Sequence, residues 1–78
     1  MYFKDDFAFE KGIFGKRLKE ERVRMGFRLC QFSNETGIDE TQISGYENRG
    51  QLPTFHSLIA CAKVLDCSID YLVGLEEA

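Results

Sequence analysis

The residues of this chain that could support covalent or metal chemistry are few and scattered. His56 is the single histidine, and the cysteines Cys30, Cys61 and Cys67 form no Cys-x-x-Cys pair. Structural zinc needs a full set of such ligands at short spacing, so no metal or other cofactor is expected. An active site needs a nucleophile beside a base in a cleft, and this short chain offers neither. The sequence therefore predicts that the protein is not an enzyme.

Hydrogen bonding to a polar partner is available instead between residues 40 and 51. Ile43 and Tyr46 are spaced to turn inward from one helix, and a step of about 100° per residue places a polar face on the opposite side. The outward positions are Thr41, Ser44, Gly45 and Asn48. Hydroxyl groups of this kind can bond the edges of bases, and the guanidinium of the following Arg49 suits phosphate.

The turn before this segment has the signals of a tight connection between two helices. Gly37 follows Thr36 where a helix end needs a residue that tolerates the left-handed conformation. Asp39 is a good N-cap for the next helix, and Gln42 three residues later completes a capping-box pattern. Two short helices joined in this way form a helix-turn-helix unit, predicted at about residues 28–48, whose second helix can enter the DNA major groove.

Apolar periodicity predicts further helices, and the expected fold class is a compact all-α domain of five short helices. The expected helices cover about 13–25, 28–36 and 40–48, one capped by Thr54, and one capped by Ser68 and ended by Gly74. The inward stripe of the helix after Thr54 is predicted to be Phe55, Leu58, Ile59, Ala62 and Leu65. Met25 is predicted on the inward face of the first helix, and Leu52 is predicted to anchor the loop that follows residue 48.

The chain divides into an arm at 1–12, a helix-turn-helix domain at 13–75 and a tail at 76–78. Tyr2, Phe3, Phe7 and Phe9 are too many aromatic residues for a solvated tail. We expect an ordered arm that packs on the domain or on a partner subunit, and the alternative is a frayed terminus.

No secretory signal is evident in the sequence. It has no basic region followed by an apolar stretch, and no apolar run long enough to cross a bilayer. No membrane partner is therefore expected. An odd number of irregularly spaced cysteines fits a reducing compartment, so the predicted localisation is cytoplasmic.

The net charge of -3 is unevenly distributed. Residues 14–54 carry seven Lys or Arg and six Asp or Glu, whereas residues 55–78 carry one and four. The helix-turn-helix half is therefore the least acidic part of the chain. It is barely positive, which limits the contribution of phosphate to any DNA affinity.

Several segments in order resemble the lambda-repressor-like helix-turn-helix family of Cro and XRE-type regulators. The matching segments are RLKEERVRMG (17–26), QFSNETGI (31–38), ISGYENRGQLPT (43–54) and LIACAKVLDCSIDYLVG (58–74). They cover nearly everything after residue 13. The resemblance implies a five-helix fold, binding to double-stranded operator DNA, usually as a dimer, and transcriptional control in a phage, prophage, mobile element or bacterium.

The resemblance also implies roles for individual positions. Arg22 and Glu47 occupy the positions of a partly buried ion pair, which either orients the recognition helix or serves the fold alone. The implied base-reading positions are Glu40, Thr41, Ser44 and Gly45. The implied phosphate contacts are Asn48, Arg49 and Gln51, with Arg28 and Arg17 as further candidates.

Three residues depart from the family pattern. Leu29 stands where the family usually has a glutamine that contacts phosphate, and Arg28 beside it is a possible replacement. Gly45 lacks a side chain that could contact a base, and Glu40 places an acid at the DNA-facing end of its helix. Each departure weakens the inference of DNA binding.

The predicted function is a sequence-specific DNA-binding transcriptional regulator, of the repressor kind, that binds a near-palindromic operator as a homodimer. The alternative is a protein-interaction module or anti-repressor derived from the same fold, with little DNA affinity and another regulatory protein as its partner. The acidic balance and the three departures favour the alternative.

Overall fold

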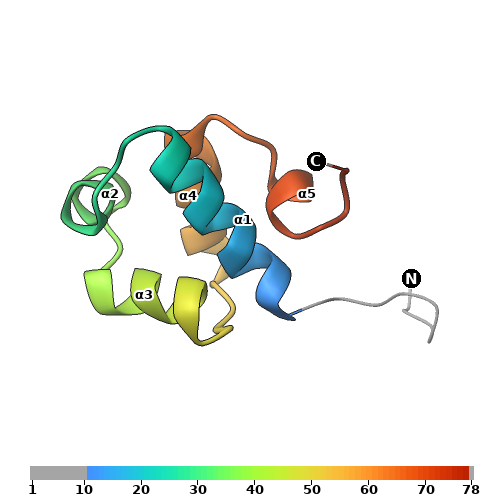
Figure 1. The fold of residues 1–78 in the computed structure, drawn as a ribbon, viewed down its shortest axis with the longest axis horizontal. Coiled ribbons are helices and arrows are strands. Elements are labelled where there is room, and N and C mark those ends of the chain that lie inside the picture. Colours follow the sequence, from blue (N-terminus) through green and yellow to red (C-terminus); the bar gives the residue numbers. More distant parts are fainter. Residues whose placement is uncertain (1–10, 78) are drawn as a thin grey trace.

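The computed structural model describes residues 11–77, and these residues form five α-helices. They are α1 (Lys11–Arg24), α2 (Leu29–Thr36), α3 (Glu40–Asn48), α4 (Phe55–Leu65) and α5 (Ile69–Leu72) (Figure 1). The all-α prediction is confirmed. The aromatic residues of the predicted arm lie outside the described residues, and so does residue 78. Residues 11 and 12, which we assigned to the arm, belong to α1.

The helix ends follow the local sequence signals. Gly26 and Gly37 have φ values of 79° and 76°, so α1 and α2 are each followed by a left-handed glycine. Asp39 caps α3 by accepting a hydrogen bond of 3.0 Å from the Thr41 N–H. The predicted capping box is incomplete, because the Gln42 side chain does not return a bond to Asp39. Thr54 and Ser68 cap α4 and α5 as predicted.

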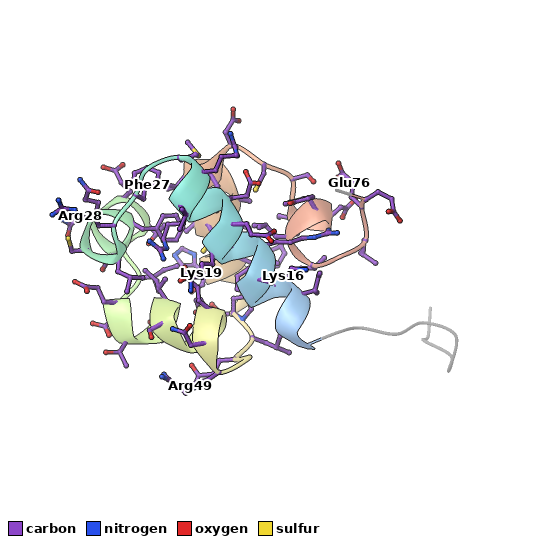
Figure 2. All side chains as sticks on the ribbon, in the orientation of Figure 1. Lys16, Lys19, Phe27, Arg28, Arg49 and Glu76 are labelled. Carbon is purple, nitrogen blue, oxygen red and sulfur yellow. The ribbon has the colours of Figure 1, made fainter. Side chains whose placement is uncertain are left out.

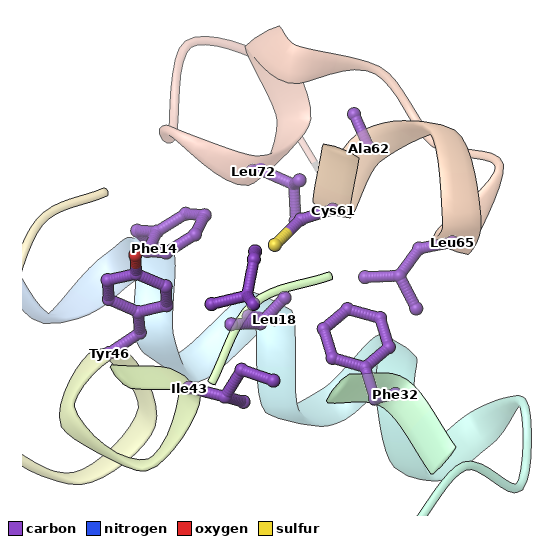
Figure 3. Close-up of a cluster of buried hydrophobic side chains, with 10 residues drawn as sticks. Phe14, Leu18, Phe32, Ile43, Tyr46, Cys61, Ala62, Leu65 and Leu72 are labelled. Atoms are coloured by element: carbon purple, nitrogen blue, oxygen red, sulfur yellow. The ribbon is translucent and has the colours of Figure 1, made fainter. Parts of the chain in front are cut away.

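The core lies where the five helices meet, with Leu18 of α1 in its middle and Phe14 of α1 beside Tyr46 (Figure 3). The other buried apolar residues are Phe32, Ile38, Ile43, Tyr46, Cys61, Ala62, Leu65 and Leu72. Each helix therefore contributes at least one buried side chain, and α3 contributes the side chains of Ile43 and Tyr46. The Tyr46 ring meets the Phe14 ring edge-on, with 5.5 Å between the ring centroids.

Three residues that we predicted to be buried are exposed. Met25 is 41% exposed because α1 ends at Arg24, and the helical period no longer places the next residue inward. Phe55 is 73% exposed because it is the first residue of α4, beyond the end of the domain core. Leu52 is 50% exposed in the irregular connection between α3 and α4, so it does not anchor that loop.

Residues 11–77 contain neither a membrane-spanning helix nor a cluster of metal ligands. None of their helices is long and apolar enough to span a membrane. Within the same range, no three His, Cys, Asp or Glu residues gather closely enough to hold a metal ion.

Candidate nucleic-acid interface

The turn between α2 and α3 sets the position of α3. Ile38 in the turn is buried, and its carbonyl oxygen accepts a 2.6 Å hydrogen bond from the Ser33 hydroxyl of α2. The Thr36 hydroxyl accepts from the Ile38 N–H at 3.2 Å. Because both polar groups of Ile38 are bonded to α2, the start of α3 is fixed relative to the preceding helix.

An ion pair ties the far end of α3 to α1. The guanidinium of Arg22 makes two hydrogen bonds to the Glu47 carboxylate, from Nε at 2.8 Å and from Nη2 at 3.0 Å. The Arg22 side chain is 10% exposed and the Glu47 side chain 3% exposed. Arg22 Nη1 donates to the Phe27 carbonyl oxygen at 2.7 Å, so the same group also fixes the turn after α1. The contact predicted between these residues is present, with α3 braced at both ends.

The face of α3 opposite Ile43 carries short polar side chains. Glu40 and Thr41 are exposed in its first turn. Ser44 and Asn48 lie one turn apart, and the Asn48 amide donates to the Ser44 hydroxyl at 3.1 Å. Asn48, which we grouped with the phosphate contacts, therefore lies on the same face as the predicted base-reading residues.

The connection after α3 folds back over this outer face. Figure 2 shows Arg49 on the side of α3 that faces away from α1. Its Nη2 donates a long hydrogen bond of 3.4 Å to the Thr41 carbonyl oxygen. Gly45 is buried, because the side chains of Gln51 and Arg49 lie over the place where its Cβ would be. The side chains of Gln51 and Arg49 therefore pack over Gly45, and this position of α3 is not open to solvent.

Arg28 lies just before α2 and Leu29 is its first residue, and the two side chains differ in burial. Arg28 is exposed on the outside of α2 (Figure 2). Its backbone N–H donates to Gln31 Oε1 at 2.9 Å. Leu29 is partly buried and packs against the core. Leu29, which stands where the family usually has glutamine, therefore packs against the core. The neighbouring Arg28 is exposed and can contact a ligand.

Arg17 does not join the residues around α3. Its Nη1 donates to the carbonyl oxygens of Tyr71 at 2.6 Å and Glu76 at 2.7 Å. Its guanidinium carbon also lies 4.4 Å from the centroid of the Tyr71 ring. The phosphate contact of Arg17 stays a prediction, and in the structure this side chain joins α1 to α5. An arginine at a helix surface can serve either role, and sequence spacing alone does not separate them.

The candidate interface, defined here as Arg28, Glu40, Thr41, Ser44, Asn48, Arg49 and Gln51, is mixed in charge. Arg28 and Arg49 are its cations, and Glu40 is its acid, with the exposed Asp39 beside it. Two cations therefore face one acid within the interface and a second acid beside it, so the surface offers hydrogen bonds in both directions with no positive excess. The close contact of the loop with α3 was not predicted, although a glycine in the middle of a helix is a signal for such a contact.

Comparisons with known proteins agree with this fold. The helix-turn-helix family profile matches residues 18–72. ImmR, an HTH-type transcriptional regulator of Bacillus subtilis, is 32% identical over 63 residues, which are 81% of this chain and 50% of ImmR. The chain spans about half the length of the Bacillus subtilis relatives that it matches, 58% and 50% in two cases.

Solved structures of helix-turn-helix domains have a similar fold. The N-terminal DNA-binding domain of SinR from Bacillus subtilis has a TM-score of 0.76 and 28% identity, covering 85% of this chain and 94% of that domain. The c2 repressor of Salmonella phage P22, solved with a synthetic operator, has a TM-score of 0.77 and 28% identity. That match covers 82% of this chain and 97% of the repressor chain. The chain therefore belongs to the lambda-repressor-like, XRE-type helix-turn-helix family.

Proposed function

We propose that the protein is a DNA-binding transcriptional repressor that presents the outer face of α3 to the major groove. The observation that carries this proposal is the arrangement of α3. It is braced by Ile38 at its start and by the ion pair of Arg22 and Glu47 at its end, while its outer face carries Thr41, Ser44 and Asn48. The relatives are regulators, one of them solved with an operator, and not enzymes. A protein of this function acts in the cytoplasm, where the DNA lies.

The proposed roles of the side chains follow from their chemistry. Thr41 and Ser44 have hydroxyl groups that can donate to or accept from base edges. Arg28 and Arg49 are exposed guanidinium groups, which match phosphate with two parallel hydrogen bonds. The Glu40 carboxylate can accept a hydrogen bond from a cytosine amino group. At any other base it repels the phosphates of the DNA. Gly45 contributes only backbone and the space above it.

The proposed unit is the domain at 13–75, acting as a homodimer on a near-palindromic site. Helix-turn-helix dimers place their recognition helices about 34 Å apart, one turn of DNA, so that each enters a half-site. Val73 and the 61%-exposed Leu75 lie at the C-terminal side of α5, where a partner would bury apolar surface. Sedimentation of the full chain with and without DNA tests this assembly, and a monomer under both conditions at high micromolar concentration contradicts it.

DNA binding itself is tested by a gel-shift titration of the full chain. The probe is duplex from the region upstream of the chain's own coding sequence, compared with a random duplex of equal length at low and moderate salt. The upstream duplex should bind more tightly. The affinity should fall with salt less steeply than for strongly basic repressors, because few cations face the DNA.

Arg28→Ala and Lys63→Ala are a matched pair for the same titration, because both remove one exposed cation. Arg28→Ala should weaken binding to every duplex by about tenfold, the size of a charged hydrogen bond. Lys63→Ala, on α4, should have little effect. If the parent chain shifts no duplex at low salt, the proposed function is wrong and the protein-interaction alternative replaces it.

A further inference from the structure

We infer that Gln51, seated over Gly45, is a specificity-determining residue that recognises an adenine in the major groove. This inference rests on the proposed function and deepens it. The family resemblance implies a phosphate contact for Gln51. The geometry of the loop after α3 places its side chain on the helix face that would meet base edges.

Two loop side chains fill the space above Gly45. A Cβ built on Gly45 would overlap Gln51 Oε1 and lie 2.7 Å from Gln51 Cδ and 2.9 Å from Arg49 Nη2. The amide of Gln51 therefore occupies the position on α3 that a side chain at residue 45 would take. Gly45 is one turn after Thr41 on the same helix face, so the amide lies beside the proposed base-reading hydroxyls.

The backbone holds Gln51 in this place. The carbonyl oxygen of Gly45 accepts hydrogen bonds from the N–H groups of Arg49, at 3.0 Å, and of Gln51, at 3.2 Å. Both loop residues are thus tied to the same peptide group of α3. Because its backbone N–H is anchored, Gln51 starts from a fixed point beside α3, and from there its side chain can reach a base edge.

The amide chemistry then selects the base. A glutamine side chain presents one acceptor and one donor group side by side, which match the N6 amino group and N7 of adenine in the major groove. A phosphate offers acceptors only, and would use half of this capacity. Arg49 also packs over Gly45 and supplies a positive charge next to the amide. Its guanidinium can bind a phosphate of the DNA while the amide of Gln51 contacts the base.

The experiment selects preferred duplexes from a randomised library with the full chain and with variants. Gln51→Ala should lose the preference for adenine at one position in each half-site, with about a tenfold loss of affinity for the preferred duplex, while other positions keep theirs. Gln51→Glu, which has the same shape but no donor, should shift the preference there toward cytosine, whose amino group a carboxylate accepts.

Gly45→Ala separates this role from a structural one. The atoms that a Cβ would meet are the ends of two flexible side chains, so the substitution should displace Gln51 without unfolding the helix. Alanine also favours helix over glycine, so thermal stability should hold or rise. The variant should nevertheless lose the same adenine preference, and adding Gln51→Ala to it should change the preference no further.

A chemical probe on the DNA gives an independent readout. Replacing the preferred adenine by 7-deazaadenine removes the N7 acceptor and should weaken binding of the parent chain by about tenfold, but not that of Gln51→Ala. A uniform loss of affinity for all duplexes in Gln51→Ala, with the base preferences intact, would overturn the inference and leave DNA binding standing. Failure of the parent chain to enrich any duplex would overturn the inference together with the proposed function.

Discussion

The carbonyl oxygen of Tyr46 in α3 lies directly against Gly15 in α1, in space that a Cβ at residue 15 would fill. The same hypothetical Cβ would lie 3.1 Å from the Cα of Glu47, so the backbones of the two helices touch at this crossing. Neither neighbour is a flexible side chain that could move aside. The depth at which α3 sits on α1, and hence the position of its outer face, depends on the absence of a side chain at residue 15.

Gly15→Ala should therefore destabilise the fold, despite the higher helix propensity of alanine. Overpacking of this kind costs about 1–3 kcal/mol in the free energy of unfolding, measured by urea denaturation. Gly12→Ala is the matched control, because Gly12 is in the same helix and has nothing within 4 Å of its Cβ position. It should be neutral or stabilise by up to about 1 kcal/mol. Equal effects of the two substitutions would show that the crossing tolerates a methyl group.

Arg22→Ala should be among the most destabilising single substitutions, at about 3–5 kcal/mol, because it leaves the Glu47 carboxylate buried without a partner. Arg24→Ala removes the exposed partner of Glu21 from the same helix and should change the unfolding midpoint little. Urea unfolding of the two variants measures the difference. A small effect of Arg22→Ala would mean that water reaches the carboxylate when the guanidinium is removed.

The thiol of Cys61 should make stability fall at alkaline pH. Burial raises its pKa from 9.0 to about 12. Between these values the unfolded chain loses the proton and the folded chain keeps it, so the folded state is progressively disfavoured as pH rises. This contribution is about 1.4 kcal/mol for each pH unit above the lower value.

Cys61→Val should lack that contribution while keeping a side chain of similar size. Unfolding free energies of the parent and the variant, measured from pH 8 to pH 11, should therefore diverge with the parent falling faster. Cys30→Ser is the control for the loss of one cysteine, since Cys30 is exposed. Parallel curves for parent and Cys61→Val would contradict the effect assigned to burial.

Glu40→Gln should tighten binding to random duplex at low salt, because an acid at the start of α3 repels phosphate. The gain should be about twofold to fivefold, as for a screened surface charge, and should disappear as salt rises. Glu77→Gln makes the same change in net charge at the C-terminal end of the described chain. Fluorescence anisotropy compares the two, and an equal gain from Glu77→Gln would reduce the effect to net charge alone.

Local signals in the sequence predicted most of the fold, because helix ends depend on neighbouring residues. Gly37, Asp39, Thr54 and Ser68 lie at the helix ends where capping chemistry places them. The periodic pattern failed only where a helix begins or stops, as at Phe55.

The candidate site was less predictable, because it depends on contacts between distant segments. Spacing shows that Arg17 is on a helix surface, but not that carbonyl oxygens more than 50 residues later bind it. In the same way, the sequence shows only that Gly45 lacks a side chain, whereas the structure shows that the loop after α3 folds over it. Such contacts require the tertiary arrangement, which no local pattern specifies.

Contact between DNA and the outer face of α3, with the loop after it, can be observed residue by residue with NMR. Amide chemical shifts of the isotope-labelled full chain are followed during titration with random duplex at low salt, which requires no knowledge of the operator. We predict that the largest changes occur in residues 40–51 and at Arg28, with little change in α5. Changes centred on α5, or no change at low salt, would contradict the assignment of this surface to DNA.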